Sequence, residues 1–309
     1  MVPVFSQVSV LLFLMAIGFL SFKLKITTKE ASEYFSSFAM KITLPCMTLN
    51  SFRRPFSTEL LGEAAASIVM SCTVFGVCLL ICWIYPRLLK IKGPERGVHR
   101  YAILISNSGF VGYPLVEAIM GPSYLFHAVI FNMPGSFLAF SIGAWFVAKE
   151  RGKTTALSWK LFITPPFVAT VVGFFMFLFS LHLPAPLALA VKMAGDITIP
   201  LSMMVIGISL AQAKIKQMLG SWRIYVTVFA RLLLIPALIG LICYFIGFKT
   251  SILMLAVILS ATPVGSSTSI LASVYNVATE EAGSLVALST MLCAITIPLI
   301  VIVLHQLIG

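Results

Sequence analysis

Charged residues are scarce in this chain: they make up 10% of its 309 residues, and 10 of them are Asp or Glu. A soluble globular protein carries about 25% charged residues, which it exposes to water. Hydrophobic residues make up 60% of the chain. This balance excludes an ordinary soluble domain and predicts an all-α, multi-pass integral membrane protein embedded in a lipid bilayer.

Several motifs of chemistry are also absent. The chain has no Gly-x-x-x-x-Gly-Lys-Ser/Thr pattern, which would indicate a nucleotide-binding loop. No two histidines or cysteines have the spacing of metal ligands, so we expect no metal and no cofactor. The spans carry no acid, base or metal constellation, which argues against a membrane-embedded enzyme. The cysteines lie in apolar segments and are interpreted as small buried hydrophobic residues: Cys46, Cys72, Cys78, Cys82, Cys243 and Cys293.

Long apolar runs are present throughout. Most reach the ~20 residues that a helix needs to cross a bilayer. The loops between them are too short for a separate soluble domain. The sequence therefore predicts ten spans, with the approximate limits 4–22, 34–52, 62–84, 101–120, 124–147, 161–180, 187–210, 222–246, 251–273 and 284–307.

Basic residues are distributed unevenly between the two sides that alternating spans define. The loops after spans one, three, five and seven hold Lys23, Lys25, Lys29, Arg87, Lys90, Lys92, Arg96, Arg100, Lys149, Arg151, Lys153, Lys160, Lys214, Lys216 and Arg223. The opposite side holds Arg53, Arg54, Lys192 and Lys249. Cytoplasmic loops carry the excess of Lys and Arg. We therefore expect a protein of the plasma (inner) membrane with both termini outside, and the net charge of +11 indicates topology rather than nucleic-acid binding.

The chain contains an internal repeat. Lys41-Ile-Thr-Leu-Pro45 resembles Asp196-Ile-Thr-Ile-Pro200 at an offset of 155, and the same offset relates Asn107 to Thr262. An odd number of spans in each half inverts the second half in the membrane. The sequence thus predicts two inverted five-helix repeats, residues 1–155 and 156–309, in one membrane domain. Chance similarity between apolar segments is the alternative.

Two stretches are unsuited to simple spanning helices. Leu104–Leu115, in the fourth span, contains polar residues, two glycines and Pro114. Ser260–Ser269, in the ninth span, contains four hydroxyl residues besides Ser260 and Ser269, together with Pro263 and Gly265. Glycine and proline weaken a helix, and paired broken helices form the substrate site of many transporters. We expect the two to cross and to aim helix N-termini at an anion. Kinked helices that only pack closely are the alternative.

These motifs together resemble the auxin efflux carrier family, over nearly the whole chain. The similarity rests on Leu44-Pro45, Asn107-Ser-Gly-Phe-Val-Gly-Tyr-Pro-Leu115, Pro200-Leu201 with Gly207, Thr262-Pro263 through Tyr275, Ser289-Thr290 and Pro298-Leu299. It implies ten spans in two inverted repeats, with crossing broken helices in spans 4 and 9. Family members move organic anions, such as auxin, malate or malonate. Asn107 and Pro263 match the asparagine and proline that pair at the crossover of the plant carriers. The long cytoplasmic loop of the best-known plant carriers is absent.

We therefore expect a secondary active transporter of small organic anions, driven by a proton gradient or the membrane potential and working by alternating access. The predicted substrate-binding residues are Asn107, Ser108, Gly109, Thr262, Pro263, Ser266 and Ser267. A sodium-coupled organic-anion symporter of the bile-acid type, which shares the crossed-helix architecture, is the first alternative. A membrane receptor or enzyme is the second. The sequence is also compatible with a homodimer.

Ionisable residues in or near the spans are functional candidates, because an intramembrane charge is costly. Asp196 precedes Pro200 by four residues, and a partly desolvated carboxylate there would carry the coupling proton. The alternative places Asp196 and Lys41 at the membrane interface. Arg231 is either a counter-ion of the substrate or a snorkelling side chain. His99 is assigned to a loop. Pro45, Pro114 and Pro200 are predicted to break their helices.

Overall fold

The computed structural model describes residues 2–150, 152, 163–212 and 221–308. Within these ranges every regular element is an α- or π-helix. Five helices are long and apolar enough to cross a membrane: Thr58–Leu88, Ser123–Lys149, Ala185–Gln212, Trp222–Ile246 and Thr279–Leu304. Shorter apolar helices cover Ser9–Lys23, Pro165–Leu178 and Thr250–Ser260. The prediction of an all-helical, multi-pass membrane protein is therefore confirmed, and the ten-span inverted repeat stays a prediction.

Helical segments occupy the positions of the expected spans, some of them built from joined pieces. In chain order they are α1 (Val2–Lys23), α2 (Lys29–Phe38), η1 (Ala39–Thr43), α3 (Leu44–Ser51), α4 (Thr58–Leu88), α5 (Pro94–Leu104), η2 (Ser108–Gly112), α6 (Tyr113–Met120), α7 (Ser123–Leu138), η3 (Ala139–Gly143), α8 (Ala144–Lys149), α9 (Pro165–Leu178), α10 (Ala185–Asp196), α11 (Thr198–Gln212), α13 (Trp222–Phe229), η5 (Ala230–Leu234), α14 (Ile235–Ile246), α15 (Thr250–Ser260), α16 (Ser267–Tyr275) and α17 (Thr279–Ile308). The η elements are π-helical turns.

The prolines that were expected to break helices act in two ways. Pro45 and Pro114 each follow a π-helical turn, η1 and η2, that joins the next helix without a gap. Proline leaves the carbonyl four residues before it without its helical donor, and a π turn lets that carbonyl bond one residue further on. The expectation of outright breaks at Pro45 and Pro114 is therefore wrong. Pro200 lies just after Ile197, the residue that separates α10 from α11.

The chain forms two compact units, each built from several stretches of sequence. Unit 1 comprises residues 1–69, 109–133 and 163–212, and unit 2 comprises 70–108, 134–162 and 213–309. Each unit takes segments from both halves of the chain, so neither unit equals residues 1–155 or 156–309. The predicted repeat boundary concerns sequence halves rather than compact units, and it stays a prediction.

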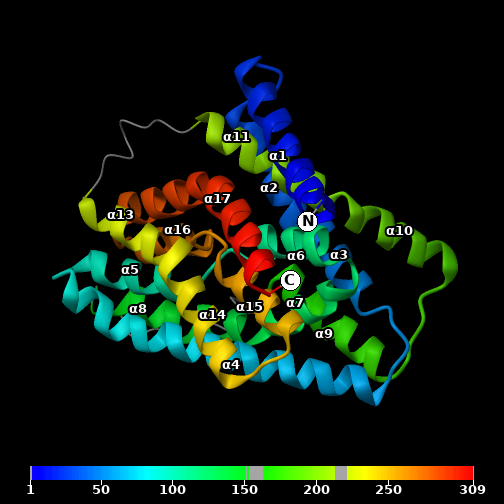
Figure 1. Cartoon of the computed structure of the whole chain (residues 1–309). Helices are drawn as coiled ribbons and strands as arrows, with labels where there is room; N and C mark the ends of the chain where they lie inside the picture. Colours follow the sequence, from blue (N-terminus) through cyan, green and yellow to red (C-terminus); the bar gives the residue numbers. More distant parts are fainter. Residues whose placement is uncertain (1, 151, 153–162, 213–220, 309) are drawn as a thin grey trace. The chain divides into compact units, whose positions relative to one another are not determined.

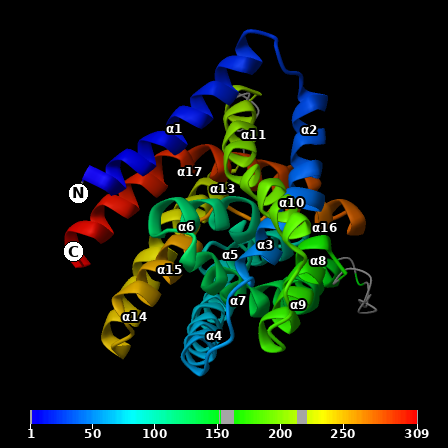
Figure 2. The same ribbon diagram turned by 90° about the vertical axis from the view of Figure 1, so that its right-hand side faces the viewer.

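Unit 1 is organised around the contact of α1 with α11, which lie side by side in both views (Figures 1 and 2). A Cβ atom added at Gly18 would overlap the backbone carbonyl of Met204, and one added at Gly207 would overlap that of Met15. The two backbones therefore approach each other closely, as small residues allow in membrane helices. Elsewhere in the unit, α3 packs against α9 and α10.

Unit 2 holds both of the stretches that the sequence predicted to be interrupted, apart from residues 109–115. Its helices α14 and α15 pack side by side (Figure 2), and α17 packs against α5, α13, α15 and α16. The residues of α5 from Gly97 to Leu104 are buried. A helix buried over this length includes polar residues that need partners inside the protein.

The cysteines are mostly buried, as expected, with exceptions. Cys78, Cys82, Cys243 and Cys293 are buried and Cys46 is half-buried. Cys72, on α4, is exposed. The expectation of a buried side chain is therefore wrong at Cys72, because an apolar sequence segment does not say which helix face packs inward.

Polar contacts at one end of unit 2 join loops that are far apart in sequence. The Arg223 guanidinium donates to the Lys90 carbonyl at 3.2 Å, and Arg96 pairs with Glu150 at 3.0 Å. Residues that the sequence assigned to the loops after spans three, five and seven thus lie close together, in agreement with a common side for these loops. The orientation in the membrane stays a prediction. Five of the basic residues that carry it lie outside the described residues: Arg151, Lys153, Lys160, Lys214 and Lys216.

Candidate functional site

The fourth expected span is interrupted between α5 and η2. Helix α5 ends at Leu104, and Ile105 adopts an extended conformation with φ −111° and ψ 120°. The chain becomes helical again at Ser108. The interruption therefore lies upstream of Gly109 and Pro114, which belong to η2 and α6. The sequence identified the stretch correctly, and the exact break falls on the polar residues rather than on the glycines and proline.

The ninth expected span is interrupted between α15 and α16. Helix α15 ends at Ser260 and α16 begins at Ser267. Pro263 and Gly265 lie inside this gap. There glycine does not have to hold a helical conformation, and proline does not have to supply a helical N–H donor. Here the predicted interruption coincides with the residues that predicted it.

The two interruptions pair with each other inside unit 2. Ser106 and Val264 form an antiparallel β-bridge. The Asn107 N–H donates to the Pro263 carbonyl at 2.8 Å, and the Gly265 N–H donates to the Ile105 carbonyl at 3.1 Å. These bonds supply partners for backbone groups that the broken helices leave unpaired, which lipid could not supply. The two chain segments thus run antiparallel at their breaks.

Gly265 permits this pairing by its size. A Cβ atom added there would lie 3.1 Å from Ile105 Cγ2 and 3.2 Å from Ser267 Oγ. Both distances are shorter than ordinary van der Waals contact between such atoms. A side chain at this position would therefore require the side chains of Ile105 and Ser267 to shift by a few tenths of an ångström.

The predicted substrate-binding residues of the break segments contact one another. Asn107 Nδ2 donates to Ser266 Oγ at 3.3 Å, so this side chain bridges the two segments. The hydroxyls of Ser106 and Ser108 lie 2.8 Å apart, and Ser108 is buried. Ser267 Oγ accepts a hydrogen bond of 2.9 Å from the Tyr101 hydroxyl of α5. Whether these residues bind a substrate stays a prediction.

The remaining predicted residues have backbone or packing roles in the structure. The Thr262 hydroxyl is fully buried and donates to the Leu259 carbonyl at 2.8 Å, so its hydrogen is already used. Pro263 contributes its carbonyl, as described above. Gly109 lies in η2, where an added Cβ would make an ordinary contact of 3.6 Å with Leu44 Cδ2. Its lack of a side chain is therefore not required by the described packing.

Two features create positive electrostatic potential near the paired interruptions. The first is the N-terminus of α16 at Ser267, where the first N–H groups of a helix have no intrahelical partner. The second is Arg231, a fully buried guanidinium that donates to the Ile103 carbonyl at 3.2 Å. That carbonyl has lost its helical donor, because the Asn107 N–H bonds to Pro263 instead. Arg231 therefore caps the broken end of α5 and does not snorkel.

Two buried polar atoms beside these features have no hydrogen-bond partner among the described residues. One is Nε of Arg231 and the other is the hydroxyl of Thr268, in the first turn of α16. A buried polar group without a partner costs about 1–3 kcal/mol. Buried side-chain atoms without a partner are few in folded proteins, and each needs a physical explanation.

Asp196, the expected coupling residue, lies in unit 1. Its carboxylate pairs with Lys192 Nζ at 2.7 Å, and the two side chains are about half exposed, 51% and 54%. A carboxylate with a lysine at hydrogen-bond distance already has its countercharge, so this geometry favours the alternative in which Asp196 lies at an interface. Its role in coupling stays a prediction.

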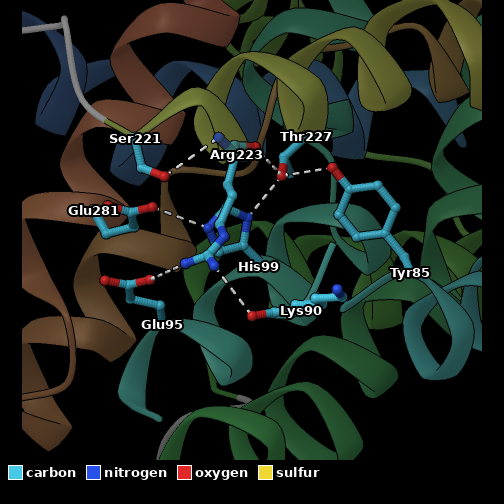
Figure 3. Close-up of polar contacts among 8 residues, drawn as sticks. All are labelled: Tyr85, Lys90, Glu95, His99, Ser221, Arg223, Thr227 and Glu281. Atoms are coloured by element: carbon cyan, nitrogen blue, oxygen red, sulfur yellow. Dashed lines mark hydrogen bonds and ion pairs between the residues drawn. The ribbon is translucent and has the colours of Figure 1, made fainter. Parts of the chain in front are cut away.

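The structure also contains a polar cluster that the sequence did not reveal (Figure 3). His99 is fully buried in α5, although the sequence assigned it to a loop. Its Nδ1 lies 2.7 Å from Thr227 Oγ1 of α13, and its Nε2 lies 3.0 Å from Glu281 Oε1 of α17. The Tyr85 hydroxyl donates to Thr227 Oγ1 at 2.8 Å. The polar residues on α5 were the available signal, because a short helix with buried polar side chains needs partners.

Charged residues around this cluster have partners of their own. Arg223 lies 3.7 Å from Glu95, and Arg96 pairs with Glu150 (Figure 3 shows the first pair). The hydrogen bonds and charge of the Glu150 carboxylate raise the pKa of the Arg96 guanidinium. The arginines therefore pair with other glutamates, and the carboxylate of Glu281 pairs with His99.

Comparisons with known proteins found a matching family of membrane transport proteins and two similar transporters. The sequence profile of a family described as "Membrane transport protein" matches residues 3–301. An uncharacterized transporter of Methanocaldococcus jannaschii is 21% identical over 304 residues, which cover 97% of this chain and 98% of that protein. An uncharacterized transporter of Methanothermobacter thermautotrophicus is 21% identical over 293 residues, 93% of this chain and 94% of that protein.

Proposed function

Because the chain belongs to the membrane transport protein family, that of the auxin efflux carriers, we propose that it is a secondary active transporter of small organic anions. Membership of a transporter family points away from an enzyme. The substrates we propose are carboxylates such as malonate or malate. The substrate site we propose is the pairing of the two interrupted segments in unit 2, and transport proceeds by alternating access around it.

The observation that carries this proposal is the chemistry gathered at the pairing. Asn107 supplies an amide side chain, Ser266 and Ser267 supply hydroxyls, and α16 begins there. A helix N-terminus favours a bound anion through its free N–H groups and its dipole. Transporters of inverted-repeat type use half-helix N-termini in this way for carboxylate groups. The pairing contains no carboxylate side chain from Ile105 to Ser108 or from Ala261 to Ser267 that would repel an anion.

Matching helix boundaries in the two halves support an inverted repeat as the framework of the site. Helices α1 and α9 end at Lys23 and Leu178, 155 residues apart. Helices α5 and α15 begin at Pro94 and Thr250, and α7 and α17 begin at Ser123 and Thr279, each pair 156 residues apart. These helix boundaries match the sequence offset of 155 to within one residue, which supports the proposed repeat. Each half contributes one interrupted span, as such a repeat requires.

Binding and transport measurements test the proposal. Purified protein is screened with carboxylates by thermal shift, since a ligand that binds the native state raises the unfolding temperature. Malonate or malate is expected to stabilise the protein and to be taken up into proteoliposomes along an imposed gradient. Parallel assays in sodium and in potassium separate this carrier from a sodium-coupled symporter. Absence of binding and uptake for every carboxylate would contradict the proposal.

The Asn107→Ala variant tests the location of the site. A lost hydrogen bond to a charged group costs about 1.5–3 kcal/mol, so carboxylate affinity should fall roughly 10- to 150-fold. The matched control is Ser289→Ala, because the Ser289 hydroxyl accepts a 3.0 Å bond from the Val264 N–H and also holds the break. The control should lower the unfolding temperature and leave affinity nearly unchanged. If Asn107→Ala behaves like the control, Asn107 only ties the segments together.

A further inference from the structure

The cluster around His99 can hold one additional proton while His99, Thr227 and Tyr85 all keep their hydrogen-bond partners. In the loaded state, by which we mean the state that holds the additional proton, His99 is an imidazolium. It donates Nδ1–H to Thr227 Oγ1 and Nε2–H to Glu281. The Thr227 hydroxyl then donates to the Arg223 carbonyl at 2.8 Å. The Thr227 oxygen accepts one hydrogen bond from His99 and one from the Tyr85 hydroxyl, so both lone pairs of the Thr227 oxygen are used.

The same positions of the heavy atoms also satisfy the unloaded state. The Thr227 hydroxyl hydrogen turns from the Arg223 carbonyl to His99 Nδ1, which becomes an acceptor. His99 is now neutral and still donates Nε2–H to the Glu281 carboxylate. One proton therefore enters or leaves through the rotation of a single hydroxyl. A buried group that lost its partner in either state would cost about 1–3 kcal/mol, and this network avoids that cost in both.

The environment suits a reversible proton site. Imidazole is the side chain that most often gains and loses a proton near neutral pH. His99 is sealed from solvent, whereas the Glu281 side chain is 15% exposed and provides the way in. The charged and titratable groups of the surrounding helices include Tyr85 and Arg87 on α4, Glu95, Arg96, Arg100 and Tyr101 on α5, Lys149 on α8, Arg223 and Tyr225 on α13, and Glu280 and Glu281 on α17. Arg223 and Arg96 have the carboxylate partners described above, and Arg100 lies over the rings of Trp83 and Phe146 at 5.2 and 5.3 Å.

Helix α5 connects this cluster to the paired interruptions. Two residues after His99, the Tyr101 hydroxyl donates to Ser267 at the start of α16. Asn107 follows His99 by eight residues: the five steps to Leu104 are helical, about 7.5 Å at 1.5 Å each, and the last three are extended, up to about 10 Å. The separation is therefore on the order of 12 Å and at most about 17 Å. We propose that His99 and Glu281 form a proton-binding site whose occupancy raises the affinity of the paired segments for an anionic substrate. The coupling to substrate rests on the transport function proposed above, whereas proton binding does not.

The expected size of the coupling follows from one unit charge at this distance. At an effective dielectric constant near 20, a charge about 12 Å away changes anion affinity roughly tenfold. A proton added to the pair makes unit 2 more positive by one charge, whichever of the two residues holds it. The affinity for malonate should therefore rise as the pH falls, and protons and anions should move together.

Nuclear magnetic resonance of histidine-labelled protein tests the proton site without any substrate. The chain has four histidines, and the His99 signal is the one missing from the His99→Gln variant. We expect this signal to move between pH 5 and 8 in the wild-type protein. The pH response should persist in Thr227→Ser, which keeps the hydroxyl, and change in Thr227→Val, which removes it. A His99 signal that stays fixed over this range would refute the proton site.

Calorimetric titration with malonate at pH 5.5 and 7.5 tests the coupling. Malonate itself gains a proton in this range, so each variant is compared with the wild type at both pH values. His99→Gln and Glu281→Gln should each remove the roughly tenfold excess pH effect. The matched control is His127→Gln, because His127 also pairs with a glutamate, Glu63 at 3.4 Å, but in unit 1. This control should keep the wild-type pH dependence.

The outcomes separate the two proposals. Malonate binding with the same pH dependence in wild type, His99→Gln and Glu281→Gln would refute the coupling and leave the transport function intact. A wild-type protein that binds no carboxylate would contradict the transport function, and with it the coupling, while the resonance measurement still decides the proton site. If His99→Gln does not fold, Glu281→Gln and Thr227→Val decide the coupling in its place.

Discussion

Alanine in place of Gly18 provides a quantitative test of the packing in unit 1. The added methyl group would overlap the backbone carbonyl of Met204 in α11. A backbone carbonyl cannot rotate away as a side chain can, so α1 and α11 must separate to relieve the overlap. On α11, Gly207 makes the reciprocal approach to the carbonyl of Met15.

The expected magnitude is the difference between two effects. Overpacking typically costs about 1–3 kcal/mol. Alanine in place of glycine inside a helix recovers up to about 1 kcal/mol. We therefore expect Gly18→Ala to lower the free energy of unfolding by about 1–2 kcal/mol. For a protein of this size that corresponds to a lower midpoint temperature by roughly 2–8 °C. Gly207→Ala should have a similar effect, and the double variant should cost less than the sum, because one separation relieves both overlaps.

Thermal unfolding of the purified variants, followed by tryptophan fluorescence, measures these effects. The matched control is Gly76→Ala in α4, where an added Cβ meets nothing within 4 Å. This control should match the wild-type midpoint or exceed it slightly. If Gly18→Ala is as stable as Gly76→Ala, α1 and α11 do not make the close contact described.

Two further predictions concern coupling and topology. Asp196→Asn should leave the pH dependence of transport unchanged, because the Asp196 carboxylate is half exposed and pairs with Lys192; a lost pH dependence in proteoliposome uptake would restore Asp196 as the proton carrier. In a background without native cysteines, a cysteine at position 151 should resist labelling from outside intact cells and one at 309 should react, because basic residues concentrate in cytoplasmic loops; labelling at 151 would overturn the orientation.

The class of the protein and the places of its broken helices could be predicted from sequence. Hydropathy is a property of each segment, so the long apolar runs identified membrane helices before any fold was known. The stretch Leu104–Leu115 and the gap around Pro263 were identified because Gly, Pro and clustered hydroxyl residues weaken a helix locally. Within the first stretch the break moved to Ile105–Asn107, because there the backbone finds partners in Pro263 and Gly265. Local propensity alone could not decide between these neighbouring positions.

The partners of polar side chains needed the tertiary structure. His99 and Glu281 are 182 residues apart. The sequence around each residue contains no pattern that predicts its contact with the other. The sequence predicted a partly desolvated carboxylate at Asp196, whereas in the structure this carboxylate is half exposed and pairs with Lys192, one helical turn away. Which face of a helix turns inward, and what meets it there, depends on the packing of the other helices.

The sequence by itself determined that this is a polytopic helical membrane protein with interrupted helices in two matching places, because composition and helix propensity act along the chain. Only the tertiary structure decided that Asn107 reaches Ser266, that Arg231 caps the broken end of α5, and that His99 lies buried between Thr227 and Glu281. These contacts join residues more than 100 positions apart. They exist because a broken helix and a buried polar group must find hydrogen-bond partners that lipid does not offer.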